Sequence, residues 1–346
     1  MTFIVGTGRC GSTMLSRILR MHPEVLSMSE FFCTVRPGTD ELPDEVIDGR
    51  RLWDVLSSPE PSVDATVRDG LATPELCYPY ETGRFTVETG IPRISHMTLP
   101  MLTDDPDALF ADLAGEVPTW PGRPSWEQVR VLFEYLAGVF GRSVIAERTA
   151  GSAMYASWLR RHFTDARFVH MYRDGPSCAL SMSTHPAARP MALMEEAGLL
   201  DGGEAGLAAA GRAAESGLLE LVQPPFDMRR IMDHPAPSLA AFGRLWSRMI
   251  QAAVEALSGL GGETLMTLRY DDLLGRPWEM LASLAEFLGV PPRPEWLAGA
   301  RRMIDSARVN RVGELDESVL AKLRDACEPG TRALAGTTQI TFARRG

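Results

Sequence analysis

Lysine is almost absent from this chain. Lys322 is the only lysine among 346 residues, although lysine and arginine together number 35. An anion site in the body of the fold must therefore use arginine, backbone N–H groups or hydroxyl groups. The formal net charge is −10, whereas proteins that bind nucleic acid without sequence preference are usually basic. We therefore expect no nucleic-acid partner.

Cysteines and long apolar runs are also scarce. The five cysteines are scattered, and no C-x-x-C pair occurs. Disulfide frameworks and structural zinc sites need paired cysteines, so we expect reduced thiols, no metal site and a cytoplasmic protein. No stretch approaches the ~18 apolar residues of a membrane span. The apolar start at residues 2–6 is too short for a signal peptide, and no basic segment precedes it.

The chain does contain an alternation of apolar strands and amphipathic helices. A strand–helix–strand–helix order predicts an α/β fold with a central parallel sheet flanked by helices. We expect a single domain over residues 1–346, with variable insertions at 34–125 and 186–262, the second mainly helical and a possible lid over the acceptor. The periodicity predicts strands at 2–6, 25–28, 143–147, 167–172 and 264–270, and helices at 13–21, 126–140, 152–162, 174–184, 238–258 and 278–288.

The first strand runs into a glycine-rich loop. In a strand–loop–helix unit, loop N–H groups and the positive helix N-terminus cradle a phosphate. Gly6 and Gly11 have the G-x-x-x-x-G spacing of a P-loop, but Ser12 and Thr13 follow directly and the P-loop lysine is missing. Arg9 supplies the positive charge from inside the loop. The pattern favours an anion site; a tight turn with chance glycines is the alternative.

A second candidate anion site follows the strand at 167–172. Arg173 stands where this strand ends, at the sheet edge where open α/β folds bind ligands. Its guanidinium can bind a phosphate with two N–H groups, and Ser181 lies two turns along the next helix. An ordinary helix start explains Asp174 and Pro176 but neither Arg173 nor the serine spacing. Two anion sites on one edge indicate a ligand phosphorylated at two places.

Together these two motifs resemble those of the sulfotransferases that use 3′-phosphoadenosine-5′-phosphosulfate. The loop is similar to the family's 5′-phosphosulfate loop, and Arg-Asp-Gly with a serine eight positions after the arginine is similar to its 3′-phosphate site. The resemblance implies a P-loop-like three-layer fold and a donor held without metal. The residues it assigns to the nucleotide are Gly8, Arg9, Cys10, Gly11, Ser12, Thr13, Arg173 and Ser181.

Further segments extend the resemblance. Residues 145–149 look like the family's Glu-Lys-Thr stretch with arginine in place of lysine, so Arg148 is expected to face the transferring group. Tyr270 resembles the tyrosine that approaches the nucleotide. Arg311 and Gly313 are similar to a segment that closes over the adenosine, although the tryptophan often found next is replaced. The match is of the bacterial type, similar to the tyrosyl-protein sulfotransferase branch.

The resemblance also implies the catalytic groups. Charge grows on the leaving oxygen in sulfuryl transfer, and Arg9 and Arg148 are our candidates to stabilise it. An alcohol acceptor needs a general base. Glu30 follows the second strand and is the first choice, similar to the glutamate of the tyrosyl-protein branch, whereas capping of the next helix is its alternative role. His96 is the rival, since cytosolic sulfotransferases use a histidine.

Two other classes of function remain open from the residues. One is a small-molecule kinase or nucleotide hydrolase that uses ATP and Mg²⁺, against which the missing P-loop lysine counts. The other is a non-catalytic nucleotide binder, which the joint presence of the candidate residues does not favour. The acceptor is expected to be the hydroxyl or amine of a small molecule, lipid or glycan. The sequence predicts neither the acceptor's identity nor the oligomeric state.

Overall fold

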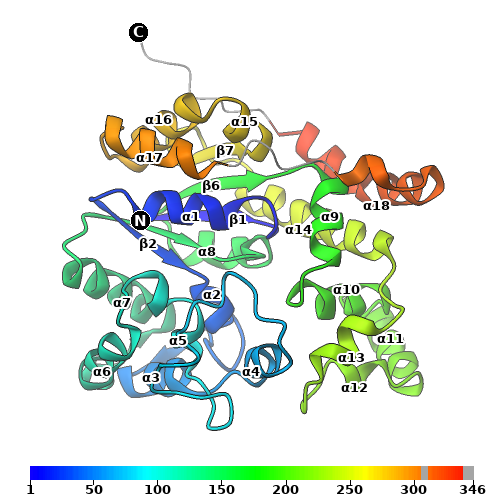
Figure 1. The fold of residues 1–346 in the computed structure, drawn as a ribbon, viewed down its shortest axis with the longest axis horizontal. Coiled ribbons are helices and arrows are strands. Elements are labelled where there is room, and N and C mark those ends of the chain that lie inside the picture. Colours follow the sequence, from blue (N-terminus) through cyan, green and yellow to red (C-terminus); the bar gives the residue numbers. More distant parts are fainter. Residues whose placement is uncertain (305–310, 338–346) are drawn as a thin grey trace.

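A parallel five-stranded sheet lies at the centre of the computed structural model, which describes residues 1–304 and 311–337 (Figure 1). The strands are β1 (Thr2–Gly6), β2 (Val25–Ser29), β5 (Val144–Arg148), β6 (Arg167–Tyr172) and β7 (Leu265–Arg269). Their order is β2-β5-β1-β6-β7, and every neighbouring pair is parallel. The predicted central parallel sheet is thus confirmed.

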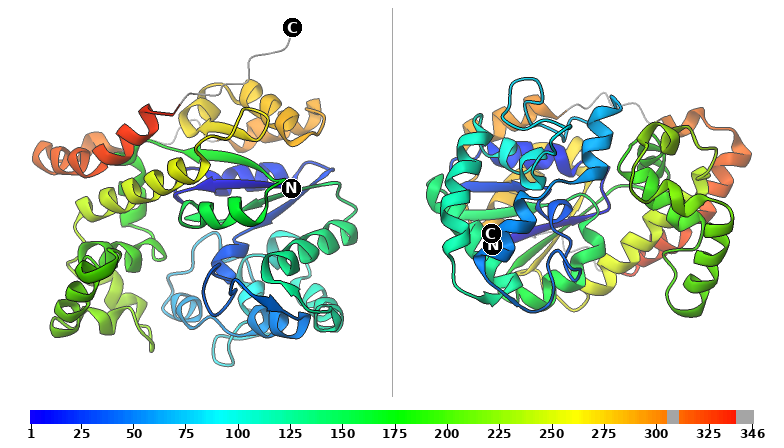
Figure 2. Two further views of the ribbon diagram at one scale, coloured as in Figure 1. Left: turned by 180° about the vertical axis from the view of Figure 1, so that it is seen from behind. Right: turned by 90° about the horizontal axis from the view of Figure 1, so that it is seen from below.

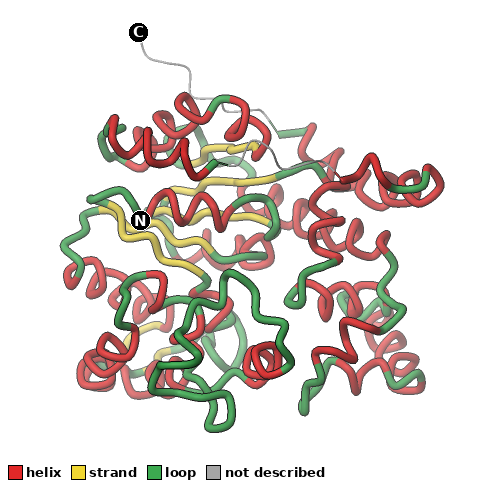
Figure 3. The backbone as a smooth tube through the Cα atoms, in the orientation of Figure 1, coloured by secondary structure: helices red, strands yellow, loops and turns green. Residues whose placement is uncertain are grey.

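Alternate residues of β1 point into two separate cores. Phe3 and Val5 belong to one apolar cluster and Ile4 to the other, as expected for a strand whose successive side chains face opposite sides. Both faces of the sheet are therefore covered by helices, which is typical of parallel sheets. Figure 3 shows the strands as a middle layer between helices.

The first face is covered by α1 (Ser12–Arg20), α15 (Tyr270–Gly275), α16 (Pro277–Leu288) and α17 (Pro294–Met303). The second face is covered by α7 (Ser125–Val139), α8 (Ala156–His162) and α14 (Leu239–Leu257). The reverse view of Figure 2 shows α8 and α14 in front of the sheet, opposite to α1. Most of these helices agree with the predicted ranges within a few residues.

The region 34–125 consists of short helices joined by loops. It contains α2 (Phe31–Thr34), which begins just before it, and then α3 (Gly49–Ser57), α4 (Pro61–Arg68), α5 (Arg93–His96), α6 (Pro106–Glu116) and the 3-10 turns η1 (Leu99–Met101) and η2 (Val117–Thr119). A small antiparallel ribbon joins β3 (Val46–Ile47) to β4 (Arg123–Pro124). Strands of two residues carry no readable periodicity, so the sequence did not predict this ribbon.

The region 186–262 is helical, as predicted. It consists of α10 (Ala188–Glu196), α11 (Gly203–Glu215), α12 (Leu218–Leu221), α13 (Met228–Asp233) and α14. The helices α10 to α13 form a group of their own at the lower right of Figure 1. This group touches the first insertion, because Asp69, just after α4, accepts a hydrogen bond from the backbone N–H of Met228 at 2.8 Å.

The strand order brings four chain segments to one edge of the sheet. β1 lies between β5 and β6, and β7 is the next strand outward. Since all these strands run in the same direction, the residues that follow them lie together at the carboxyl edge, where ligands bind in open α/β sheets. These are the loop after β1, Thr149 after β5, Arg173 after β6 and Tyr270 after β7.

Candidate active site

The loop after β1 adopts the backbone conformation of an anion cradle. Gly8, Arg9 and Gly11 have positive φ values of 74°, 55° and 89°, and α1 begins at Ser12. Left-handed residues followed by a helix N-terminus turn successive N–H groups toward one point. Glycine is required at position 11, because a Cβ there would lie 2.2 Å from Cδ2 of Tyr270.

Residues from four segments meet around this loop. Nε of Arg9 donates to Oγ of Ser181, on α9 (Gly175–Ser183), at 3.3 Å. The ring of Tyr270 packs on Gly11, and the guanidinium of Arg173 lies over that ring at 5.0 Å. The two predicted anion sites are thus contiguous, with Arg9 reaching from the first to the second.

A carboxylate of the chain itself contacts two side chains at the loop and the start of α1. Oε1 of Glu75 lies 3.3 Å from Nη1 of Arg9 and 3.2 Å from Oγ1 of Thr13. Nε2 of His185 is 3.7 Å from Oε2 of the same carboxylate. Burial alone would raise the pKa of Glu75, but the His185 and Thr73 side chains and the charge of Arg9 hold it well below its ordinary value.

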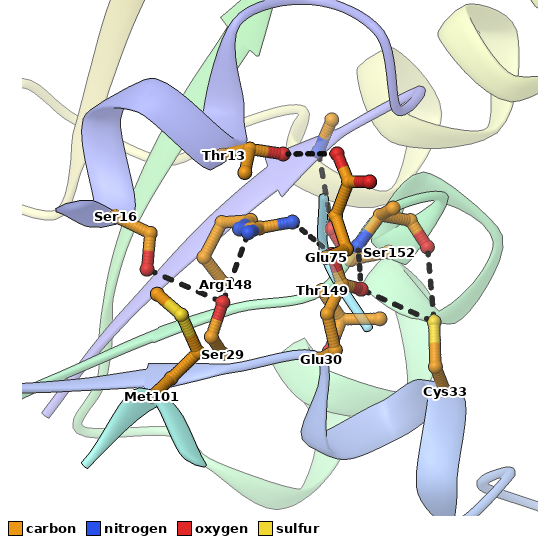
Figure 4. A network of polar contacts seen from close by, with 12 residues as sticks. Thr13, Ser16, Ser29, Glu30, Cys33, Glu75, Met101, Arg148, Thr149 and Ser152 are labelled. Carbon is orange, nitrogen blue, oxygen red and sulfur yellow. Dashed lines mark hydrogen bonds and ion pairs between the residues drawn. The ribbon is translucent and has the colours of Figure 1, made fainter. Parts of the chain in front are cut away.

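Glu30 and Arg148 form a buried ion pair near the loop (Figure 4). Nη1 of Arg148 donates to Oε1 of Glu30, and its Nη2 donates to Oγ of Ser29 at 2.9 Å. The other Glu30 oxygen accepts from the N–H of Ala150 at 2.8 Å and from the thiol of Cys33 at 3.2 Å. Both carboxylate oxygens therefore have partners.

Arg9 and Glu30 share an unusual backbone conformation. Within the described residues they are the only non-glycine residues with positive φ, at 55° and 58°. This conformation costs about 1–3 kcal/mol unless surrounding contacts hold it. Here the side-chain contacts hold both residues: Ser181 and Glu75 contact Arg9, whereas Arg148 contacts Glu30.

Comparison with known proteins gives one family. Residues 2–201, more than half of the chain, match the model of a family described as the sulfotransferase family. The chain belongs to the sulfotransferase family. It is an enzyme of that class, and residues 2–201 include both predicted anion sites together with Glu30, Arg148 and His96.

Solved structures similar to this sulfotransferase have low sequence identity. The sulfotransferase domain from the curacin biosynthetic pathway is 16% identical, with a TM-score of 0.47 and 97% of each chain covered. The sulfotransferase domain from the Synechococcus PCC 7002 olefin synthase is 15% identical, with a TM-score of 0.48, covering 98% of this chain and 95% of that one. Sulfotransferase STF9 from Mycobacterium avium is 12% identical, with a TM-score of 0.46, covering 98% of this chain and 77% of that one. No curated protein gave a significant match.

Four further predicted residues of this sulfotransferase lie in the loop, at the start of α1 or on a turn beside α9; they are Cys10, Ser12, Arg311 and Gly313. The side chain of Cys10 is buried in the core between the sheet and α1, so only the backbone of this residue can face a ligand. Burial also raises the pKa of its thiol. Ser12 starts α1 and is buried. The turn η4 (Arg311–Glu314) contacts α9 and contains Gly313; the side chain of Arg311 lies outside the described part.

His96 is buried rather than solvated. It closes α5 with an exposed fraction of 1%, its Nδ1 is 3.2 Å from the hydroxyl of Tyr80, and its Nε2 is 3.3 Å from Oδ1 of Asp64. The segment that carries Tyr80 also carries Glu75. His96 therefore lies beneath the segment that reaches the loop, and none of its hydrogen bonds or ion pairs joins Glu30.

Glu75 was not predicted from the sequence. It stands in a proline-rich stretch between α4 and α5, 62 positions from Thr13, and no local pattern indicates that it reaches the loop. Within residues 1–304 and 311–337, no group of three or more His, Cys, Asp or Glu side chains is placed to hold a metal ion. In the same residues, none of the helices combines the length and the apolar character needed to span a bilayer.

Proposed function

We propose that this sulfotransferase uses 3′-phosphoadenosine-5′-phosphosulfate as its donor and sulfates a hydroxyl or amine of a small-molecule, lipid or glycan acceptor. The observation that carries the proposal is the Glu75 carboxylate on Arg9 and Thr13. A carboxylate oxygen stands there as a sulfuryl or phosphate oxygen would, so the loop side chains already have a geometry that accepts an oxyanion. Arg173 and Ser181, contiguous with them, fit the 3′-phosphate.

In this proposal each end of the donor has its own residues. The loop N–H groups, Ser12, Thr13 and Arg9 hold the 5′-phosphosulfate, and Arg173 and Ser181 hold the 3′-phosphate. Tyr270, between Gly11 and Arg173, offers a ring face to the nucleotide. Gly313 lies on a turn beside α9, in a position to close the 3′-phosphate side together with Arg311.

The bound donor supplies a sulfuryl group. As the acceptor oxygen bonds to sulfur, the bond between sulfur and the 5′-phosphate oxygen breaks, and the electron pair of that bond stays on the phosphate oxygen. Arg9 stabilises the charge that develops on that oxygen, and fixed donors of this kind contribute typically ~10²–10³-fold in rate. Glu30 accepts the acceptor's proton at a carboxylate oxygen. Arg148 orients Glu30 through their ion pair and contributes positive charge to the same side of the site.

To accept the acceptor's proton, Glu30 must give up a hydrogen bond at one of its carboxylate oxygens. Oε1 of Glu30 is held by Arg148, whereas Oε2 is held by one N–H and one thiol. Thiols are weak donors, so the contact with Cys33 is the one most easily given up. The left-handed backbone of Glu30 supports this assignment, since held strain of this kind clusters at functional sites.

Ligand-induced stabilisation tests the choice of donor. A ligand that binds only the folded state at 100 times its Kd stabilises that state by about 2.7 kcal/mol. We expect 3′-phosphoadenosine 5′-phosphate to raise the melting temperature strongly and ADP weakly. A rise with ATP and Mg²⁺ but none with the bisphosphate would refute the proposal and favour the kinase alternative.

Glu30→Gln tests the base. The variant should keep its affinity for 3′-phosphoadenosine 5′-phosphate and lose turnover by ~10²–10⁴-fold, because the amide cannot accept the proton. Turnover is followed as release of the bisphosphate from the sulfated nucleotide in the presence of a panel of phenols, alcohols and amines. Glu134→Gln, on the exposed face of α7, is the matched control. Undiminished turnover in Glu30→Gln would transfer the role to His96.

A further inference from the structure

Glu75 approaches the loop from the region 34–125. It belongs to the stretch between α4 and α5, and its side chain is 13% exposed. The backbone of this stretch is held on two sides. Nη2 of Arg17, on α1, donates to the carbonyl of Pro74 at 3.0 Å, and the N–H of Cys77 donates to the carbonyl of His96 at 3.1 Å.

The carboxylate uses the groups that the donor needs. Its Oε1 contacts both Arg9 and Thr13, which the proposed function assigns to the 5′-phosphosulfate. A second anion at the same Nη1 and hydroxyl would lie against the carboxylate and be repelled by it, because like charges repel strongly at such distances. Its Oε2 lies 3.7 Å from Nε2 of His185. Arg9 and Thr13 thus hold the carboxylate together with the neighbouring His185 and Thr73 side chains.

We propose that Glu75 is a specificity-determining residue that competes with the 5′-phosphosulfate end of the donor for the loop. This inference rests on the proposed function. Anions that cannot displace the carboxylate are excluded, whereas a nucleotide that is also anchored at Arg173 and Ser181 can displace it. Within the described residues, no hydrogen bond or ion pair joins Glu75 to Arg173 or Ser181, although Arg9 contacts both Glu75 and Ser181.

The segment that carries Glu75 is anchored to α5. The hydroxyl of Tyr80, five residues after Glu75, lies 3.2 Å from Nδ1 of His96, and the N–H groups of Cys77 and Tyr78 donate to the His96 carbonyl. Because the backbone is held in this way, displacement of the carboxylate needs only a rotation of the Glu75 side chain.

The magnitude follows from the fraction of molecules in which the loop is open. If the carboxylate occupies the loop about nine times in ten, the apparent affinity of a competing ligand is reduced about tenfold. Glu75→Gln keeps the shape but removes the charge and so should recover about that factor. Glu75→Ala removes the contact entirely and should recover at least as much.

The test compares three probes by calorimetry. We expect Glu75→Gln to bind 3′-phosphoadenosine 5′-phosphate and inorganic sulfate about tenfold more tightly than the unmodified chain. Adenosine 3′-monophosphate, which lacks the 5′-anion, should bind both proteins equally. Glu81→Gln, exposed on the same segment, is the matched control and should change none of the three. The melting temperature of each variant checks that it is folded.

The outcomes separate this inference from the proposed function. Unchanged or weaker binding of the bisphosphate and sulfate by both Glu75 variants would overturn the competition. A gain of the same size for adenosine 3′-monophosphate would also overturn it, because the effect would then be general. If neither the unmodified chain nor the variants bind the bisphosphate, the proposed donor is wrong, and sulfate binding alone then decides whether Glu75 competes for the loop.

Discussion

Glu147 should make the stability of this protein depend on pH in a way that one substitution removes. It lies on β5 between the two cores, fully buried, and Oγ1 of Thr149 donates to its Oε1 at 2.5 Å. Burial, together with the negative charge of Glu30, raises the pKa of Glu147 to about 8, although Arg148 acts in the opposite direction. The buried side chain therefore keeps its proton at neutral pH.

The direction and size of this pH dependence follow from the difference in pKa between the folded and unfolded chain. The ordinary pKa is 4.5, so between that pH and about 8 the folded chain holds one proton more than the unfolded chain. Stability then falls as pH rises through this window, by at most about 1.4 kcal/mol per pH unit. From pH 5 to pH 7 the loss from this one group is about 2–3 kcal/mol.

Glu147→Gln replaces the neutral acid by a neutral amide of the same shape, which can still accept from Thr149. The variant should match the unmodified chain at pH 5 and exceed its unfolding free energy by about 2–3 kcal/mol at pH 7. Urea denaturation of both proteins at pH 5, 6 and 7 measures this difference, in which the other titrating groups cancel.

A matched control is Glu134→Gln, which changes the same charge on the exposed face of α7. Its stability relative to the unmodified chain should not follow the pH trend of Glu147→Gln. The reasoning is refuted if the two proteins that differ at Glu147 keep a constant difference in unfolding free energy across the three pH values.

Two further substitutions probe the nucleotide side of the site. Gly11→Ala places a Cβ 2.2 Å from a ring atom of Tyr270 at φ +89°, so it should abolish binding of 3′-phosphoadenosine 5′-phosphate and lower the melting temperature. Gly141→Ala is the control: it has φ +60° and no atom within 4 Å of the new Cβ, so it measures only the backbone cost of about 1–3 kcal/mol. Equal effects in both glycine variants would contradict the role of the Tyr270 contact. Arg173→Gln should weaken calorimetric binding of the bisphosphate about 10- to 100-fold and leave adenosine 5′-monophosphate unaffected, since a hydrogen bond to a charged group contributes about 1.5–3 kcal/mol. Equal losses of affinity for both nucleotides would refute the assignment of the 3′-phosphate to Arg173.

Local patterns were sufficient for the sheet and its main helices. The strand predicted at 167–172 is β6 with the same bounds, and the helix predicted at 126–140 is α7 shifted by one residue. These elements are long enough for their apolar period to show in the sequence. The ribbon of β3 and β4 was missed because each strand has two residues and pairs across 76 positions or more.

The candidate site was only partly readable for a related reason. The loop, Arg173 and Ser181 are local motifs at strand ends, and a shared strand direction places them at one edge. The ion pair of Glu30 with Arg148 was not predicted, although each residue was singled out by itself. Its formation depends on β2 lying beside β5, and this neighbourhood is a property of the sheet order.

By itself, the sequence determined the α/β class and predicted two anion sites, one in a loop without a lysine and one at Arg173 and Ser181, because each pattern lies within a short stretch of the chain. Only the tertiary structure decided that Glu75 contacts Arg9, that His96 is buried and contacts Tyr80 of the same segment, and that Arg9 reaches Ser181. These contacts join residues between 16 and 172 positions apart. Their partners are chosen by packing of the insertions against the sheet, and no pattern along the chain records that choice.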